Sequence, residues 1–291
     1  MTLLQSILLG IVQGLTEFLP VSSSGHLAIF QNLLHVDTGD DLLFDVLLHI
    51  GTLLVVLIVF RKDILQLILE ALGMLRDILV NIRIWAENRK AVSLTPYRRI
   101  IGTNYRKFVA LIIVSTIPTG IIGVLGSKLI SDASDELIVP GICLIITGIL
   151  LLLSDKAEDK GKIPQDITYR EGVIVGIAQG LATLPGLSRS GTTLFAELQC
   201  GFSRTFAVRY SFILSIPAIL GAAILELKDL DTSAVSSSMA GIYLAGIIAA
   251  AVVGYLCIRF MLRVVREKKL RYFAFYCFVA GAAAIIGYFV L

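Results

Sequence analysis

The sequence predicts an all-α polytopic membrane protein, an inverted-topology repeat with six transmembrane helices plus two re-entrant broken-helix pairs. Composition is the first observation, because the 291 residues are 56% hydrophobic and only 16% charged, which is far more apolar than a soluble domain. The second is that several apolar stretches approach the roughly 20 residues that a spanning helix needs, without the alternation of a transmembrane barrel. The third is an internal repeat.

The internal repeat aligns residues 10–26 with residues 176–192, shifted by 166 positions without a gap. The identical positions in the first copy are Gly10, Ile11, Gln13, Gly14, Leu15, Ser22, Ser24 and Gly25. We therefore expect one membrane domain over residues 1–291, composed of repeat 1 at about 1–153 and repeat 2 at about 168–291.

The first copy opens with two short apolar pieces within residues 2–34, broken at Pro20 and at the run Ser22 to Gly25. Each piece is too short to cross a bilayer alone. Non-helical backbone at membrane depth is tolerated only where protein buries it or water lines it. We therefore expect a re-entrant helix pair whose break faces an internal cavity.

The rest of the first copy contains three predicted spans, at about 42–60, 108–126 and 137–153. Between the first two lies the only long polar region, residues 61–107, which we interpret as a basic cytoplasmic loop. Its apolar residues are spaced as in an amphipathic helix at about 64–85, which we expect to lie along the membrane surface.

The second copy repeats this plan. Its broken pair lies at about 172–202, and its spans lie at about 205–226, 239–258 and 272–290. Three crossings per copy make the second copy inverted relative to the first. If the 61–107 loop is cytoplasmic, 22 of the 25 Lys and Arg residues fall on the cytoplasmic side, which is the positive-inside pattern with both termini outside.

Inverted copies bring the two helix breaks together near the bilayer midplane, where half-helix N-termini present unpaired amides and a positive dipole end. Such a place suits an anion, and phosphate is the natural candidate. Serine is a good N-cap and glycine permits close backbone approach. The predicted binding residues are Ser22, Ser24, Gly25, Ser188, Ser190, Gly191 and Thr192.

Four other side chains at the breaks are candidates for chemistry. Arg189 has a planar fork suited to phosphate oxygens. Gln13 and Glu17 stand four residues apart on one helix face, so both face the cavity and Glu17 can hold a metal ion or a proton. His26 can exchange protons with a phosphate oxygen or with a serine, although it can equally be only a cap. Asp45, His49 and Glu197 receive no role.

These motifs resemble a known family. Gln13-x-x-x-Glu17, Pro20-Val-Ser-Ser-Ser-Gly-His26 and Pro185-Gly-Leu-Ser-Arg-Ser-Gly-Thr-Thr193 look like the signatures of the undecaprenyl-diphosphate phosphatase family of the bacitracin-resistance type. The resemblance implies removal of the terminal phosphate from undecaprenyl diphosphate, recycling the cell-wall lipid carrier. It also implies that Glu17 is a catalytic carboxylate, Ser23 the nucleophile, His26 its proton partner and Arg189 the phosphate clamp.

Some alternatives stay open. His26 can replace Ser23 as the nucleophile, and a transporter or flippase of anionic polyprenyl phosphates uses the same architecture. A divalent ion, Mg²⁺ or Ca²⁺, is a candidate cofactor, but Gln13 leaves a single carboxylate for it; no organic cofactor is expected.

The expected partners are the polyprenyl diphosphate and the lipid bilayer, without nucleic acid and with the oligomeric state open. The expected location is the bacterial plasma membrane, with the site open to the outer side.

Overall fold

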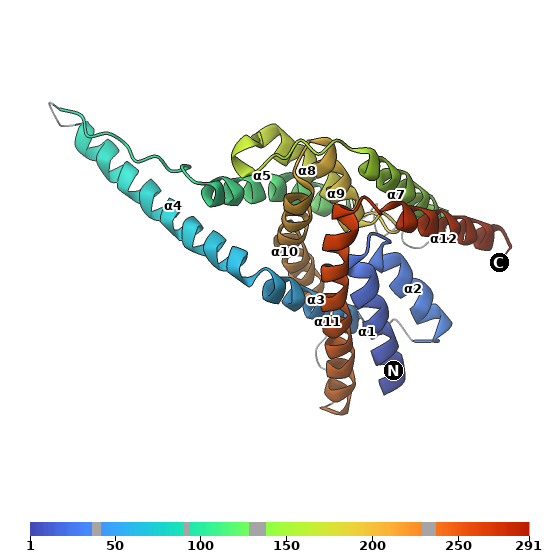
Figure 1. Ribbon diagram of the computed structural model, residues 1–291. Coiled ribbons are helices and arrows are strands. Elements are labelled where there is room, and N and C mark those ends of the chain that lie inside the picture. The colour runs from blue at the N-terminus through green and yellow to red at the C-terminus, as the bar shows by residue number, and fades with distance from the viewer. Residues whose placement is uncertain (37–41, 90–92, 128–137, 229–236, 291) are drawn as a thin grey trace.

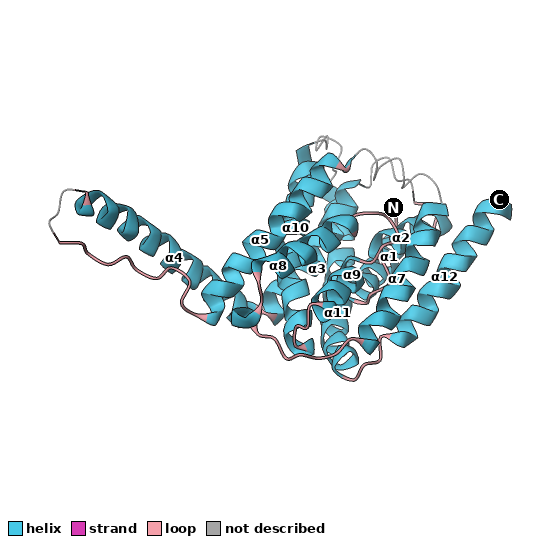
Figure 2. Cartoon of the chain, turned by 90° about the horizontal axis from the view of Figure 1, so that it is seen from above, coloured by secondary structure: helices cyan, strands magenta, loops and turns pink. Residues whose placement is uncertain are grey.

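The computed structural model describes residues 1–36, 42–89, 93–127, 138–228 and 237–290, and these residues form helices without a named strand (Figures 1 and 2). The first copy contains α1 (Leu3–Phe18), α2 (Ser23–Leu33), α3 (Leu42–Val59), α4 (Arg61–Asn88), α5 (Asn104–Leu125) and α7 (Ile138–Lys156). The short 3-10 turn η1 (Pro164–Asp166) follows. The second copy contains α8 (Tyr169–Leu181), α9 (Arg189–Gln199), α10 (Arg204–Lys228), α11 (Ser237–Arg266) and α12 (Arg271–Val290).

Five of the described helices are long and apolar enough to cross a membrane, namely α5, α7, α10, α11 and α12. A sixth crossing results if α3 and α4, which meet at a bend of 83°, count as one broken span. The prediction of an all-helical membrane protein is confirmed, with five or six spans. The connecting segments at 37–41, 128–137 and 229–236 lie outside the described residues.

Both broken pairs occur where they were predicted. Helix α1 has 16 residues and α8 has 13, so at 1.5 Å per residue they reach only about 24 and 20 Å, short of the roughly 30 Å hydrocarbon core. Gln5 Nε2 near the start of α1 donates to the Leu34 carbonyl just after α2 at 2.9 Å. The chain therefore returns to the end from which it entered.

The second pair folds back in the same way. The Lys162 amide, before α8, donates to the Gly201 carbonyl, after α9, at 3.2 Å. The two hairpins are based near opposite ends of the long helix α11. Ser6 of α1 donates to the carbonyl of Ile242 at the beginning of α11. Arg204, just after the second hairpin, donates to the carbonyl of Val265 at its end.

Small residues let each copy pack into the other. Helix α1 lies along α11 of the second copy, and α8 lies along α5 of the first. A Cβ atom added to Gly10 would lie 2.2 Å from the Gly246 carbonyl oxygen, and one added to its repeat counterpart Gly176 would lie 2.2 Å from the Ser115 carbonyl oxygen. Only glycine allows this approach of the backbones.

Helix α4 extends away from the other helices (Figures 1 and 2). The predicted amphipathic helix at 64–85 is confirmed and is longer, covering 61–88. The main helical core lies around buried aromatic residues from α5, α10 and the turn between α9 and α10, namely Phe108, Phe202, Phe206 and Tyr210.

Candidate active site

Glu17 is the centre of the polar side chains at the first break. It lies near the end of α1, and its side chain is only 4% exposed. Its Oε2 accepts hydrogen bonds from Ser23 Oγ at 2.7 Å and from Gln13 Nε2 at 3.2 Å, while its Oε1 accepts one from the Arg189 guanidinium. A buried carboxylate requires such partners, because an unpaired charge at this depth is costly.

Arg189, at the second helix break, contacts Glu17 at the first helix break. It is the first residue of α9 and lies 172 positions from Glu17 along the chain. Glycines keep the two breaks close: a Cβ atom on Gly25 would lie 3.9 Å from Gly186 Cα, and one on Gly191 would lie 3.3 Å from Pro20 Cβ. The structure thus places the predicted residues Gln13, Glu17, Ser23 and Arg189 in one cluster.

The first turn of α2 has no side-chain cap. Ser22 has a positive φ of 71° and makes no capping hydrogen bond, so the predicted capping role of Ser22 is wrong. Its hydroxyl instead lies 3.4 Å from that of Ser24, which is exposed. A positive φ is uncommon for serine and differs from the extended backbone of an ordinary N-cap residue. The first amides of α2 are consequently not bound by this cap.

The first turn of α9 differs. The buried hydroxyl of Ser188 accepts a hydrogen bond from the Gly191 amide at 3.2 Å, as the predicted cap does. Ser190 Oγ lies 3.4 Å from Ser188 Oγ. Thr192 is buried, and its Oγ1 has no hydrogen-bond partner among the described residues. The two breaks are therefore alike in sequence but differ in which amides remain available.

His26 is turned away from Ser23. Its Nδ1 lies 2.7 Å from the Ser22 carbonyl oxygen, and its Nε2 is hydrogen-bonded to the hydroxyl of Tyr276 on α12. A carbonyl oxygen only accepts, so Nδ1 carries the proton and Nε2 accepts from the tyrosine. The expectation that His26 folds back onto Ser23 is wrong, because Glu17 occupies the position of the serine's proton acceptor.

Two further residues near the cluster have no predicted role. His49 of α3 lies with its Nε2 3.8 Å from Glu17 Oε2, and its Nδ1 donates to the Asp45 carbonyl at 2.8 Å. Tyr276 reaches His26 from 250 positions away. An ionisable residue inside a predicted span is a signal for a site, and His49 carried that signal. No local pattern indicates Tyr276.

Glu197 and Asp45 are the other two carboxyl residues to which the sequence gives no role. Glu197 is fully buried within α9, and neither of its carboxyl oxygens has a hydrogen-bond partner among the described residues. Asp45 accepts a hydrogen bond from Gln31 at 2.7 Å. Glu17 is the carboxylate that Ser23 and Arg189 contact directly.

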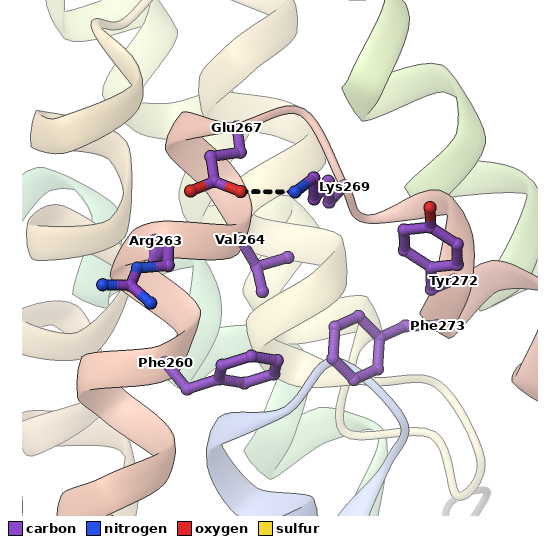
Figure 3. Close-up of a pocket in the computed structure, with 7 residues that line it drawn as sticks. All are labelled: Phe260, Arg263, Val264, Glu267, Lys269, Tyr272 and Phe273. Atoms are coloured by element: carbon purple, nitrogen blue, oxygen red, sulfur yellow. Dashed lines mark ion pairs between the residues drawn. The ribbon is translucent and has the colours of Figure 1, made fainter.

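A second place with charged groups is a pocket of about 570 Å³ between the end of α11 and the start of α12 (Figure 3). It is lined by Phe260, Arg263, Val264, Glu267, Lys269, Tyr272 and Phe273. Lys269 donates to Glu267 at 2.6 Å and so holds the pKa of that carboxyl below its usual value. Both charges are exposed and mutually neutralised, and the lining residues include no serine, cysteine or histidine, which makes this a poorer candidate for catalysis.

The site fits a metal ion only together with a substrate. The part of the chain that the structure describes contains no group of three or more His, Cys, Asp or Glu side chains that could hold one. However, Gln13 Oε1 is buried without a partner beside Glu17. Magnesium commonly binds through one or two carboxylates plus substrate phosphates. Glu17 and Gln13 are suitable for that mode.

Comparisons with known proteins identify the family of the chain. The family model described as bacitracin resistance protein BacA matches residues 6–283. Proteins named undecaprenyl-diphosphatase are similar over nearly their whole length: that of Alkaliphilus metalliredigens is 40% identical over 286 residues, 98% of each chain. Those of Halothermothrix orenii (41%, 98% of each chain) and Methanosphaera stadtmanae (40%, 98% of this chain and 97% of that one) are similar to the same degree. The chain therefore belongs to the bacitracin resistance protein BacA family.

Proposed function

We propose that this protein hydrolyses undecaprenyl diphosphate to undecaprenyl phosphate and inorganic phosphate, which regenerates the lipid carrier of cell-wall precursors. The observation that carries the proposal is the hydrogen-bonded series Ser23–Glu17–Arg189, which links the two helix breaks. It combines a hydroxyl, its proton acceptor and a cation for phosphate. The names of relatives similar over nearly the whole chain support the same activity.

Arg189 and the amides of α2 bind the terminal phosphate. The Arg189 side chain donates to Glu17 through one terminal nitrogen and is 20% exposed. A guanidinium has five donors, so the rest of the fork remains for two phosphate oxygens. The first amides of α2, which no side chain caps, add donors where charge develops on the transferring phosphoryl group.

Ser23 attacks the terminal phosphorus while its proton passes to Glu17 Oε2, 2.7 Å away. The new bond joins Ser23 Oγ to phosphorus, and the anhydride P–O bond breaks, so that undecaprenyl phosphate leaves. The leaving undecaprenyl phosphate takes that proton from Glu17. Water then attacks the phosphoserine with Glu17 as the base, the bond between Ser23 Oγ and phosphorus breaks, Ser23 recovers the proton from Glu17, and inorganic phosphate departs. His26 is a weaker candidate for the nucleophile, because its Nε2 must first release the Tyr276 hydroxyl.

The site could hold a divalent ion once the substrate is bound. Glu17 and Gln13 Oε1 would hold it beside the diphosphate, and when bound it supplies positive charge next to the transferring group. Because Gln13 is an amide and not a second carboxylate, the protein without the substrate would hold such an ion only weakly.

The repeat is inverted in this proposal, with both termini outside and the site open to the outer side of the plasma membrane. Three observations support this arrangement: the hairpins are based near opposite ends of α11, α1 and α8 exchange partners between the copies, and Lys and Arg gather on the predicted cytoplasmic side. The lipid tail stays in the bilayer while its head group reaches the two breaks.

The test is phosphate release from undecaprenyl diphosphate by the purified protein in detergent. Glu17→Ala and Arg189→Ala should lose turnover, while Glu267→Gln, in the pocket of Figure 3, should retain it. Full turnover by both site variants would refute the site. No turnover by the folded wild-type protein, with or without Mg²⁺ and Ca²⁺, would refute the function and favour carriage of the lipid without hydrolysis.

A further inference from the structure

One face of α4 is apolar and exposed along the length of the helix. Its members are between 38% and 67% exposed and recur at spacings of three and four residues: Leu65, Ile68, Leu69, Leu72, Leu75, Ile78, Leu79, Ile82 and Trp85. Soluble surfaces rarely carry so large a continuous apolar patch. A helix that projects away from the body with such a face has a partner that the described chain does not supply.

The other face of α4 is polar and is covered by the chain's own return segment, residues 93–106. Arg106 donates to Glu70 at 2.9 Å and to Asp77 at 2.8 Å. Asn81 exchanges two hydrogen bonds with the backbone of Arg98, and farther along Asn88 exchanges two with that of Thr95. These contacts fix the rotation of α4 relative to its own chain, so that the apolar face points away from the return segment.

The width of the apolar face favours lipid over a second copy of this chain. Residues 65, 68, 72, 75, 79 and 82 follow the a and d positions of a heptad, which also occur in coiled coils. However, the column next to them is apolar as well: Ile78 and Trp85 are exposed, while Ile64 and Ala71 at its start pack against the main core. A coiled coil uses that g column for charges that select the partner, whereas an interfacial helix needs a broad apolar face.

The position of α4 in the fold also favours lipid as the partner of its apolar face. Only Phe60 separates it from α3, and the two helices meet at 83°. Exposed Leu54 and Ile58 at the end of α3 lead directly into the exposed Leu65 of α4. Its apolar face is therefore continuous with the apolar outer surface of the membrane-embedded helices.

We propose that α4 and its return segment form an arm that docks on the lipid bilayer, with the apolar face among the upper acyl chains and the return segment toward water. The arm suits an anionic leaflet. Its described basic residues are Arg61, Lys62, Arg76, Arg83, Arg89, Arg98, Arg99 and Arg106. Four of them pair with acidic residues of the arm, namely Arg76, Arg83, Arg98 and Arg106. Positive charges near an anionic leaflet are attracted to it. Arg89 lies over the Trp85 ring, 4.9 Å from its centroid, an aromatic and basic pair typical of the lipid interface.

Trp85 reports on this contact directly, because it is the only tryptophan in the sequence. The purified protein is reconstituted in phosphatidylcholine–phosphatidylglycerol vesicles whose acyl chains carry bromine at positions 6 and 7. We expect the bromolipids to remove most of the Trp85 emission and aqueous iodide to have little effect. A matched control is Trp85→Phe combined with Tyr97→Trp, which moves the probe to an exposed residue of the return segment; its emission should respond to iodide much more than to bromine.

Two results would overturn the inference. Quenching of Trp85 by iodide as strong as that of the residue 97 probe, with no effect of bromolipid, would place the face in water. Protection from both quenchers, together with disulfide formation between two Leu79→Cys chains that persists on dilution into excess lipid, would assign the face to a second copy.

Discussion

At the scale of single residues, Arg189 is the cation that reaches both Glu17 and the expected phosphate. We predict that Arg189→Lys keeps the positive charge but loses about 100-fold or more in kcat, the range for removal of one donor to a developing anion, because a point charge cannot make two parallel hydrogen bonds. Steady-state phosphate release measures this. Wild-type kcat in Arg189→Lys would mean that simple charge suffices.

Among the three consecutive serines Ser22, Ser23 and Ser24, only Ser23 donates a hydrogen bond to Glu17. Ser23→Ala should abolish turnover, whereas Ser24→Ala, whose exposed hydroxyl contacts only Ser22, should retain most of it. Ser24→Ala should unfold at nearly the wild-type temperature, whereas Ser23→Ala, which removes one hydrogen bond to the buried Glu17, should unfold at a lower temperature but remain folded. Substantial hydrolysis by Ser23→Ala would move the assignment to His26.

The residues at the breaks could be predicted from the sequence because a polar run within apolar segments is costly unless it has a function. The hydrogen-bond partners of these residues could not be predicted from the sequence. The pairing of Glu17 with Ser23 depends on the turn at Ser22 taking a positive φ, an uncommon conformation for serine. His49 and Tyr276 approach through tertiary packing that no spacing rule encodes.

At the scale of elements, the approach of α1 to α11 depends on Gly10. Gly10→Ala places a Cβ atom 2.2 Å from the Gly246 carbonyl oxygen, so we predict destabilisation of about 1–3 kcal/mol, as for overpacked cores, together with reduced turnover because α1 also carries Glu17. Thermal unfolding in detergent measures the first effect. Gly120→Ala is the control, because a Cβ atom there meets nothing within 4 Å; equal stability of the two variants would contradict the close packing.

Helix types and most boundaries followed from hydropathy and from the prolines and serines at the breaks. The largest difference is α11, predicted at 239–258 and observed as Ser237–Arg266. Its last two turns contain Arg259, Arg263 and Arg266, which a search for apolar spans excludes although the backbone continues as helix. Hydropathy thus indicates the membrane-embedded part of a helix and not its end.

At the scale of the whole molecule, the topology has a direct test. We expect Asn88→Cys, at the end of α4, to be protected from an impermeant thiol reagent in intact cells, and Ser134→Cys to react. The basis is the distribution of Lys and Arg between the two sides; residue 134 itself lies outside the described residues. Labelling of residue 88 without labelling of residue 134 would contradict the proposed orientation.

The most direct test of the whole account is rapid-quench trapping of the phosphorylated protein with undecaprenyl diphosphate labelled in its terminal phosphate. We predict an acid-stable phosphoserine at Ser23, formed in the wild-type protein and lost in Arg189→Ala, because the hydroxyl of the first copy needs the cation of the second. An acid-labile phosphate on His26, or turnover with no trapped intermediate at any quench time, would contradict nucleophilic attack by Ser23.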